Sequence, residues 1–154
     1  MKKLKLVLLF LSIAFLALQF IPKNAKIRSP KVVDKSLEIK VATGIHKSLR
    51  RACYDCHSNQ TSWPLYTKIF PLSLYFEHEV EEAREELNFS NWESFSLKKK
   101  SKKSFEIVES LELKEMPPEN YITLHAEAKV SAKELEAIKK WADDIDKEYA
   151  NSRQ

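Results

Sequence analysis

Residues 52–58 have the sequence Ala-Cys-Tyr-Asp-Cys-His-Ser, and Cys53 and Cys56 are the only cysteines among the 154 residues. Positions i, i+3 and i+4 share one face of a helix, so both sulfurs and the His57 imidazole can act from the same side. Cys-x-x-Cys-His is the attachment signature of a c-type haem. The motif predicts one covalently attached haem c, with thioethers to Cys53 and Cys56 and with His57 as a ligand of the iron.

Two other chemistries also use paired cysteines. The first is a disulfide, either redox-active or structural, but a thioredoxin-like redox site belongs to an α/β pattern that this sequence lacks. A zinc site would need about two further ligands, drawn from His46, His57, His78 or His125, and no second ligand pair has close spacing. Haem is therefore favoured, with the disulfide and zinc sites as alternatives.

Met116 is the candidate ligand for the second axial position of the iron, because it is the only methionine besides Met1. Pro117 disfavours helical backbone at Met116 and holds it extended in a loop, from which a thioether can reach the iron. The alternatives are that Met116 only fills a turn, or that a histidine takes its place. The candidate histidines are His46, His78 and His125.

Composition favours an all-α chain with one domain. There is a single glycine, which argues against tight hairpins, whereas Lys, Glu, Leu and Ala are abundant. An apolar stripe at Leu37, Val41, Ile45 and Leu49 predicts a helix that starts near Ser36 and runs into Cys53. A second helix is expected from Pro71 to Asn88, with its glutamates in water. Capping-box pairs, Ser90 with Glu93 and Ser131 with Glu134, predict a third helical region and a last helix.

The N-terminal residues 1–22 have the pattern of an export signal or signal anchor. Lys2, Lys3 and Lys5 precede an apolar run that ends at Pro22, and no Ala-x-Ala cleavage pattern follows it. We expect an uncleaved membrane helix that leaves the rest of the chain in the periplasm or at the cell exterior. Residues 23–35 are then a tether and residues 36–150 the haem-binding domain.

Charge argues against nucleic acid as a partner. Residues 1–28 hold six basic and no acidic residues, which leaves 20 basic against 22 acidic in the remainder. No basic stripe interleaved with aromatic residues is present there, and the short lysine run at 98–103 is typical of a solvated helix face.

Beyond the motif, the chain resembles the bacterial haem-binding domain family of small monohaem proteins. Two groups of residues carry the resemblance, which covers roughly residues 45–142. They are Ala52-Cys53-Tyr54-Asp55-Cys56-His57-Ser58-Asn59 with Thr61, Trp63-Pro64, Tyr66 and residues 87–92, and Glu115-Met116-Pro117 with Tyr121, residues 124–128, Ser131, Ile138 and residues 141–142. The resemblance implies a c-type haem protein with an N-terminal membrane segment, in which Cys53, Cys56 and His57 attach the haem and Met116 is the distal ligand. His125-Ala126 stands where such sequences often have His-Pro.

These features together predict a cytochrome c-like helical domain that carries single electrons to and from redox partner proteins. Two protein ligands leave no open position on the iron, so we do not expect an enzyme. The alternatives are a haem-based sensor with a displaceable distal ligand and, less favoured, a thiol-disulfide protein.

Overall fold

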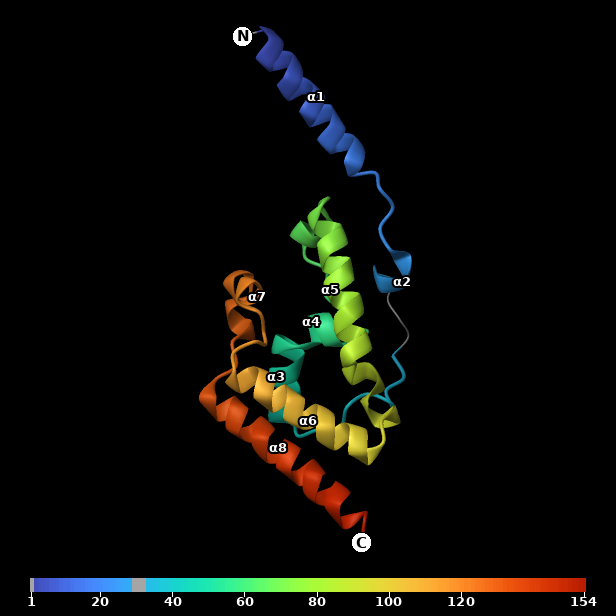
Figure 1. Cartoon of the computed structure of the whole chain (residues 1–154), viewed down its shortest axis with the longest axis vertical. Helices are drawn as coiled ribbons and strands as arrows, with labels where there is room; N and C mark the ends of the chain where they lie inside the picture. The colour runs from blue at the N-terminus through green and yellow to red at the C-terminus, as the bar shows by residue number, and fades with distance from the viewer. Residues whose placement is uncertain (1, 29–32) are drawn as a thin grey trace.

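The computed structural model describes residues 2–28 and 33–154, and all regular secondary structure in these ranges is helical (Figure 1). The expected all-α class is confirmed. The α-helices are α1 Lys2–Leu18, α2 Ala25–Arg28, α3 Thr43–Ala52, α4 Tyr54–His57, α5 Leu72–Glu86, α6 Leu97–Glu112, α7 Glu119–Leu124 and α8 Ala132–Asn151, and the 3-10 helices are η1 Leu65–Lys68, η2 Phe89–Ser94 and η3 Ala126–Ala128.

The core lies where α6 and α8 pack against each other and against α3, α4 and η2 (Figure 1). Phe89 is fully buried and stacks on the ring of Tyr54 at 5.6 Å between centroids. Trp92 follows it in η2, and the centroid of its ring lies 5.4 Å from that of Trp141 in α8. Burial of such large aromatic side chains removes 150–250 Å² of surface each, roughly, and dominates the stabilisation of a small core. The haem motif is therefore attached directly to the core through Tyr54.

The helix before the motif is shorter than expected. It begins at Thr43, and not near Ser36, because residues 37–39 pair with η2 instead of continuing the helix. The Ile39 N–H donates to the Phe89 carbonyl at 3.0 Å, and the Glu93 N–H donates to the Leu37 carbonyl at 2.9 Å. Ile39 is thereby buried without being helical.

One expected capping box is wrong and the other is confirmed. Ser90 does not cap a helix; the Asn88 side chain accepts the Ser90 N–H and opens η2, and Ser96 caps α6. Ser131 and Glu134 form the reciprocal box that was predicted for α8. Asn88 takes the capping position in place of Ser90 because its side-chain amide oxygen reaches the backbone N–H two residues ahead, as in an Asx turn.

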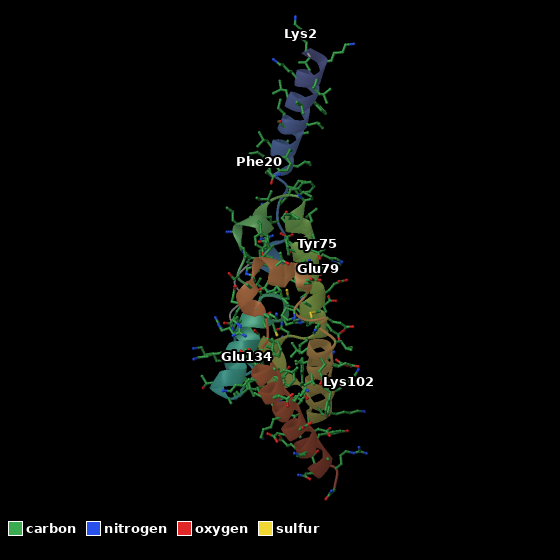
Figure 2. The ribbon with its side chains drawn as sticks, turned by 90° about the vertical axis from the view of Figure 1, so that its left-hand side faces the viewer. Lys2, Phe20, Tyr75, Glu79, Lys102 and Glu134 are labelled. Atoms are coloured by element: carbon green, nitrogen blue, oxygen red, sulfur yellow. The ribbon has the colours of Figure 1, made fainter. Side chains whose placement is uncertain are left out.

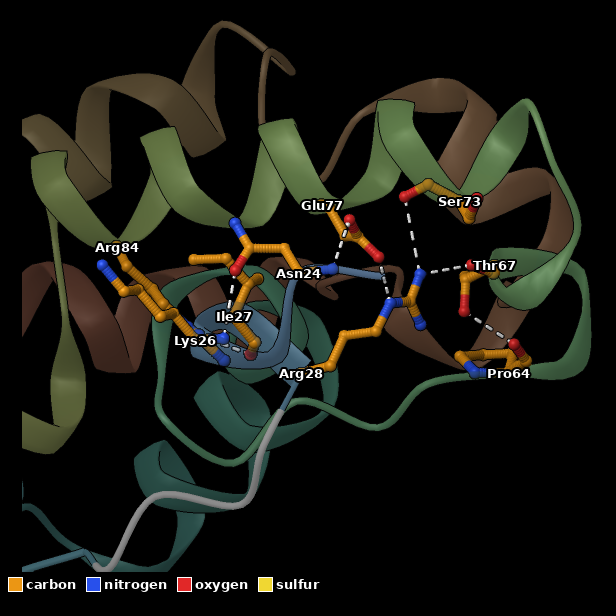
Figure 3. Close-up of polar contacts among 9 residues, drawn as sticks. All are labelled: Asn24, Lys26, Ile27, Arg28, Pro64, Thr67, Ser73, Glu77 and Arg84. Atoms are coloured by element: carbon orange, nitrogen blue, oxygen red, sulfur yellow. Dashed lines mark hydrogen bonds and ion pairs between the residues drawn. The ribbon is translucent and has the colours of Figure 1, made fainter. Parts of the chain in front are cut away.

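The second expected helix corresponds to α5, which starts after Pro71, but one of its glutamates is buried. Glu77 was expected in water and instead pairs with Arg28, which approaches from α2 (Figure 3). The lysine run also differs from expectation, since Lys103 is buried and pairs with Glu86 and Glu106. In both cases a neighbouring segment brings an opposite charge, which offsets the cost of burial.

Part of the expected tether lies on the domain. Ala25–Arg28 form α2, Ile27 is buried, and the Asn24 N–H donates to Glu77 Oε2 at 3.1 Å (Figure 3). The Arg28 guanidinium lies 4.2 Å from the centroid of the Trp63 ring and also donates to the Thr67 carbonyl. Residues 29–32, which belong to the same expected tether, lie outside the described residues.

The expected transmembrane helix is not supported. α1 has 17 residues, and within the described ranges no helix is both long and apolar enough to cross a membrane. None of its side chains is buried against the rest of the protein, and Figure 2 shows it projecting from one end of the domain.

Glu134 joins α8 to α3, and this contact makes stability depend on pH. Its carboxylate accepts the Ser131 N–H, the Ser48 hydroxyl and the Arg51 guanidinium. These hydrogen bonds, of which the one from the Ser131 backbone has the largest effect, lower the pKa of Glu134 to about 2. The contribution of the Glu134 carboxylate to the free energy of unfolding is therefore complete above pH 4.5 and is lost as the pH falls towards 2.

Glu134→Gln should therefore reduce the free energy of unfolding by about 2 kcal/mol at pH 6 and by little near pH 2. Urea denaturation across this pH range measures the difference. Glu136→Gln, on the exposed side of the same helix, is the matched control and should change stability by about 0.5 kcal/mol or less. A loss for Glu134→Gln that is the same at both pH values would contradict the account.

Candidate haem-binding site

The cysteine motif forms a single helical turn that follows α3. Cys53 ends α3 with φ −126°, and its carbonyl accepts the His57 N–H at 2.8 Å and the Cys56 N–H at 3.2 Å. Both thiols are free and partly accessible. The fully buried Ser58 closes the turn by donating its hydroxyl to the Tyr54 carbonyl at 2.7 Å. The backbone thus fixes the relative positions of the two sulfurs and the imidazole.

The His57 ring is oriented by the C-terminal end of α5. Its Nδ1 lies 2.9 Å from the Ala83 carbonyl and 3.2 Å from the Leu87 carbonyl. Two acceptors at Nδ1 require the proton on that nitrogen, which leaves the lone pair on Nε2 free to bind a metal. Burial lowers the pKa of His57, so the imidazole is neutral and able to ligate at neutral pH.

His57, Cys53 and Met116 line the same cavity, which has a volume of about 470 Å³. Its other walls come from the end of α5, from Phe89 and from α6. This volume lies within the range of about 300–1,000 Å³ that is common for small-molecule sites. The structure therefore brings together three of the four residues that the sequence singled out.

Cys56 faces a second cavity, of about 450 Å³, so α4 forms a wall of both. Aromatic side chains line it; they come from residues 58–64, which we call the polar loop, and from η1, α5 and α7, and are Trp63, Tyr66, Tyr75, Phe76 and Tyr121. A wall of this kind suits a flat apolar ring. Cys53 and Cys56 thus line different cavities, which differs from the expectation that both sulfurs and His57 act from one side of the turn.

Met116 lies in the loop between α6 and α7, as expected from Pro117. Its N–H and that of Glu115 both donate to the Ser110 carbonyl at the end of α6. The Met116 side chain is 43% exposed, so it is accessible on the rim of the His57 cavity. A thioether from a distant part of the chain thus lies on the cavity that His57 lines, and methionine with histidine is one of the ligand pairs that hold haem iron in proteins.

The other histidines have partners away from the His57 cavity. His125 Nε2 lies 2.7 Å from the Tyr66 hydroxyl, and its ring stacks on Tyr121. His78 is exposed beside Glu82, and His46 meets the edge of Tyr54. Among these candidates, Met116 alone shares a cavity with His57.

Several site residues were not found by sequence reasoning. Asp55, inside the motif, accepts the Tyr121 hydroxyl at 2.9 Å and the Ser62 N–H at 2.9 Å. Arg84 of α5 donates to the Ser58 carbonyl and to the Thr61 hydroxyl. These contacts tie α7 and the polar loop to the motif. The one sequence feature that could have indicated these contacts is Asp55 itself, a charged residue between the two cysteines of the motif.

The alternatives to haem find little support in the site. Burial raises the pKa of Cys53 to about 12 and that of Cys56 to about 11, whereas a reactive thiol needs a lowered pKa. No cluster of three or more His, Cys, Asp or Glu side chains that could hold a metal ion occurs in the part of the chain that the structure describes. The neutral imidazole, the free thiols and the aromatic wall of the Cys56 cavity fit a haem.

Comparison with protein families agrees with this geometry. Residues 13–144, most of the chain, match the family model described as haem-binding domain. The chain belongs to the haem-binding domain family. No curated protein and no solved structure matches it. Membership of this family supports haem binding by the chain.

The bond between Tyr121 and Asp55 gives a test of the site in this haem-binding domain. Tyr121→Phe should lower the free energy of unfolding by about 1–2 kcal/mol, because a hydrogen bond to a charged group is lost. Chemical denaturation followed by far-UV circular dichroism measures it. The matched control is Tyr75→Phe, whose ring lines the same cavity but is 46% exposed. Equal effects of the two changes would show that the bond does not hold α7.

Proposed function

We propose that this protein is a monohaem c-type cytochrome that transfers single electrons. In this proposal Cys53 and Cys56 bind one haem through thioethers, and His57 and Met116 are the axial ligands of its iron. The observation that carries it is the shared cavity of His57 and Met116, with the His57 Nδ1 proton already engaged by α5.

The protein's contribution is rigid placement of the ligands. A haem supplies one-electron chemistry at its iron, and its reduction potential depends on the axial ligands and on burial. His57 is fixed by two carbonyls and Met116 by a loop that is tied to the end of α6. Ligands from both sides leave no free position for a substrate, which favours an electron carrier over an enzyme and implies redox partner proteins.

We also propose that α1 directs the chain to the membrane and that the domain lies on its outer side, in the periplasm or at the cell exterior. Support comes from Lys2, Lys3 and Lys5 ahead of an apolar helix none of whose side chains is buried. Positive charge at the start of such a segment favours retention of that end in the cytoplasm.

A haem-based sensor is the second candidate function. The observation in its favour is the exposure of Met116, since a ligand at the rim of a cavity can be displaced more readily than a buried one. In that case a small gas would replace the thioether. Carbon monoxide binding distinguishes the two functions, because a stable six-coordinate carrier should bind it slowly or not at all.

Covalent attachment is tested on protein expressed with a cytochrome c maturation system. Intact mass should show one added haem, and a pyridine haemochrome spectrum should be of the c type. Cys53→Ala/Cys56→Ala should lose both. Wild-type protein that carries no added mass, although a control cytochrome matures in the same cells, would contradict the proposal.

The role of Met116 is tested by Met116→His. Replacement of the thioether by imidazole should lower the reduction potential by a sizeable fraction of the roughly 0.8 V that axial ligands span. Met116→Ala should bind carbon monoxide rapidly. His125→Ala is the matched control, and neither its potential nor its slow carbon monoxide binding should change substantially. An unchanged potential in Met116→His would exclude Met116 as the ligand.

A further inference from the structure

One end of the domain exposes an unusual number of large apolar side chains. They belong to the chain just after α1, to η1 and the residue after it, and to the first turn of α5. We call this surface the apolar end; its residues are Phe20, Ile21, Leu65, Ile69, Leu72, Leu74 and Tyr75. Leu65 is 75% exposed and Phe20 87%, and Figure 2 shows Phe20 and Tyr75 at the same end of the molecule. A concentration of this kind marks an interaction surface.

The apolar end continues the surface of α1. The Phe70 N–H donates to Gln19 Oε1 at 2.9 Å, which joins the end of α1 to the residues before α5. A few residues on, Asn24 and Arg28 both bind Glu77 (Figure 3). These contacts hold the apolar helix and the apolar end next to each other, so one apolar partner can cover both.

Charge around the apolar end is positive. Lys23, Lys26 and Lys68 are exposed, and residues 58–76 contain no Asp or Glu. Of the first two carboxylates of α5, Glu77 is buried against Arg28, whereas Glu79 is exposed and lines the same cavity as Leu72 and Tyr75; the exposed lysines therefore outnumber the exposed carboxylates at this end. Apolar side chains flanked by lysines are the pattern of surfaces that lie in the headgroup region of a bilayer, with the cations near lipid phosphates.

We propose that the apolar end docks on the surface of a phospholipid bilayer. Leu65, Ile69, Leu72 and Tyr75 enter the boundary between headgroups and acyl chains, and Lys23 and Lys68 lie at the phosphates. Leu72 and Tyr75 also line the cavity that holds Cys56, so the bilayer covers part of its rim. Docking therefore orients the cofactor site relative to the membrane. This inference rests on the proposed placement of the domain outside the membrane.

The test is photo-crosslinking in nanodiscs that contain a diazirine phospholipid in a mixture of phosphatidylglycerol and phosphatidylcholine. The full chain, loaded with haem, is illuminated, digested and mapped by mass spectrometry. Peptides from residues 63–76 should carry the lipid label at least tenfold more often than those from residues 97–112, which contain Phe105, itself 43% exposed. Label on α1 serves as the internal control for insertion.

Leu65→Glu/Ile69→Glu, at two exposed positions that do not line the Cys56 cavity, should abolish the label at residues 63–76 and retain it on α1, and Phe105→Glu should change neither. All three positions are exposed, so circular dichroism should show that the fold persists. Absence of label from residues 63–76 in the wild type would overturn the proposal, whether or not α1 is labelled. In a parallel sample treated with an amine-reactive bifunctional crosslinker, links between copies through Lys68, without lipid label at residues 63–76, would assign the surface to a second copy and overturn it as well. Haem content, read from absorption of the same samples, reports separately on the proposed function.

Discussion

The contact between the His57 ring and the end of α5 is the constraint on which the site depends. The Ala83 carbonyl accepts the Leu87 N–H that ends α5, and His57 Nδ1 adds a second donor to it and also reaches the Leu87 carbonyl beyond the helix. The same bond selects the tautomer that can bind a metal and fixes the direction of Nε2. It also places the motif between α5 and the buried Phe89, so the site and the core share one wall.

The remaining contacts of the site extend outwards from this anchor. Asp55 holds α7 through Tyr121, and His125 joins α7 to η1 through Tyr66. Arg84 reaches back to the polar loop and to the Ile27 carbonyl. The walls of both cavities are thus tied to the turn that contains the cysteines. Such preorganisation suits a carrier, whose surroundings should change little when an electron arrives or leaves.

Sequence patterns predicted the parts of this arrangement that local chemistry controls. The helical class, the turn at Cys53–His57, the loop position of Met116 and the capping box of α8 follow from spacing, from proline or from one side chain and the backbone beside it. Membership of the haem-binding domain family also agrees with the motifs quoted from the sequence.

Features that depend on distant partners were missed. Glu77 looks like one of many solvated glutamates, and only the approach of Arg28 from 49 residues away explains its burial. The late start of α3 depends on pairing between residues 37–39 and η2. Ser90 does not cap a helix because the Asn88 side chain accepts the Ser90 N–H and starts η2 instead. Hydrophobic periodicity carries no information about such encounters, because it describes one segment at a time.

The central claim is that His57 and Met116 bind the same iron. Iron K-edge X-ray absorption of the purified holo-protein measures the ligands directly. The account predicts one sulfur scatterer from a thioether among nitrogen ligands, and its loss in Met116→Ala. A shell that contains nitrogen alone in the wild type would contradict the account and assign the second position to a histidine.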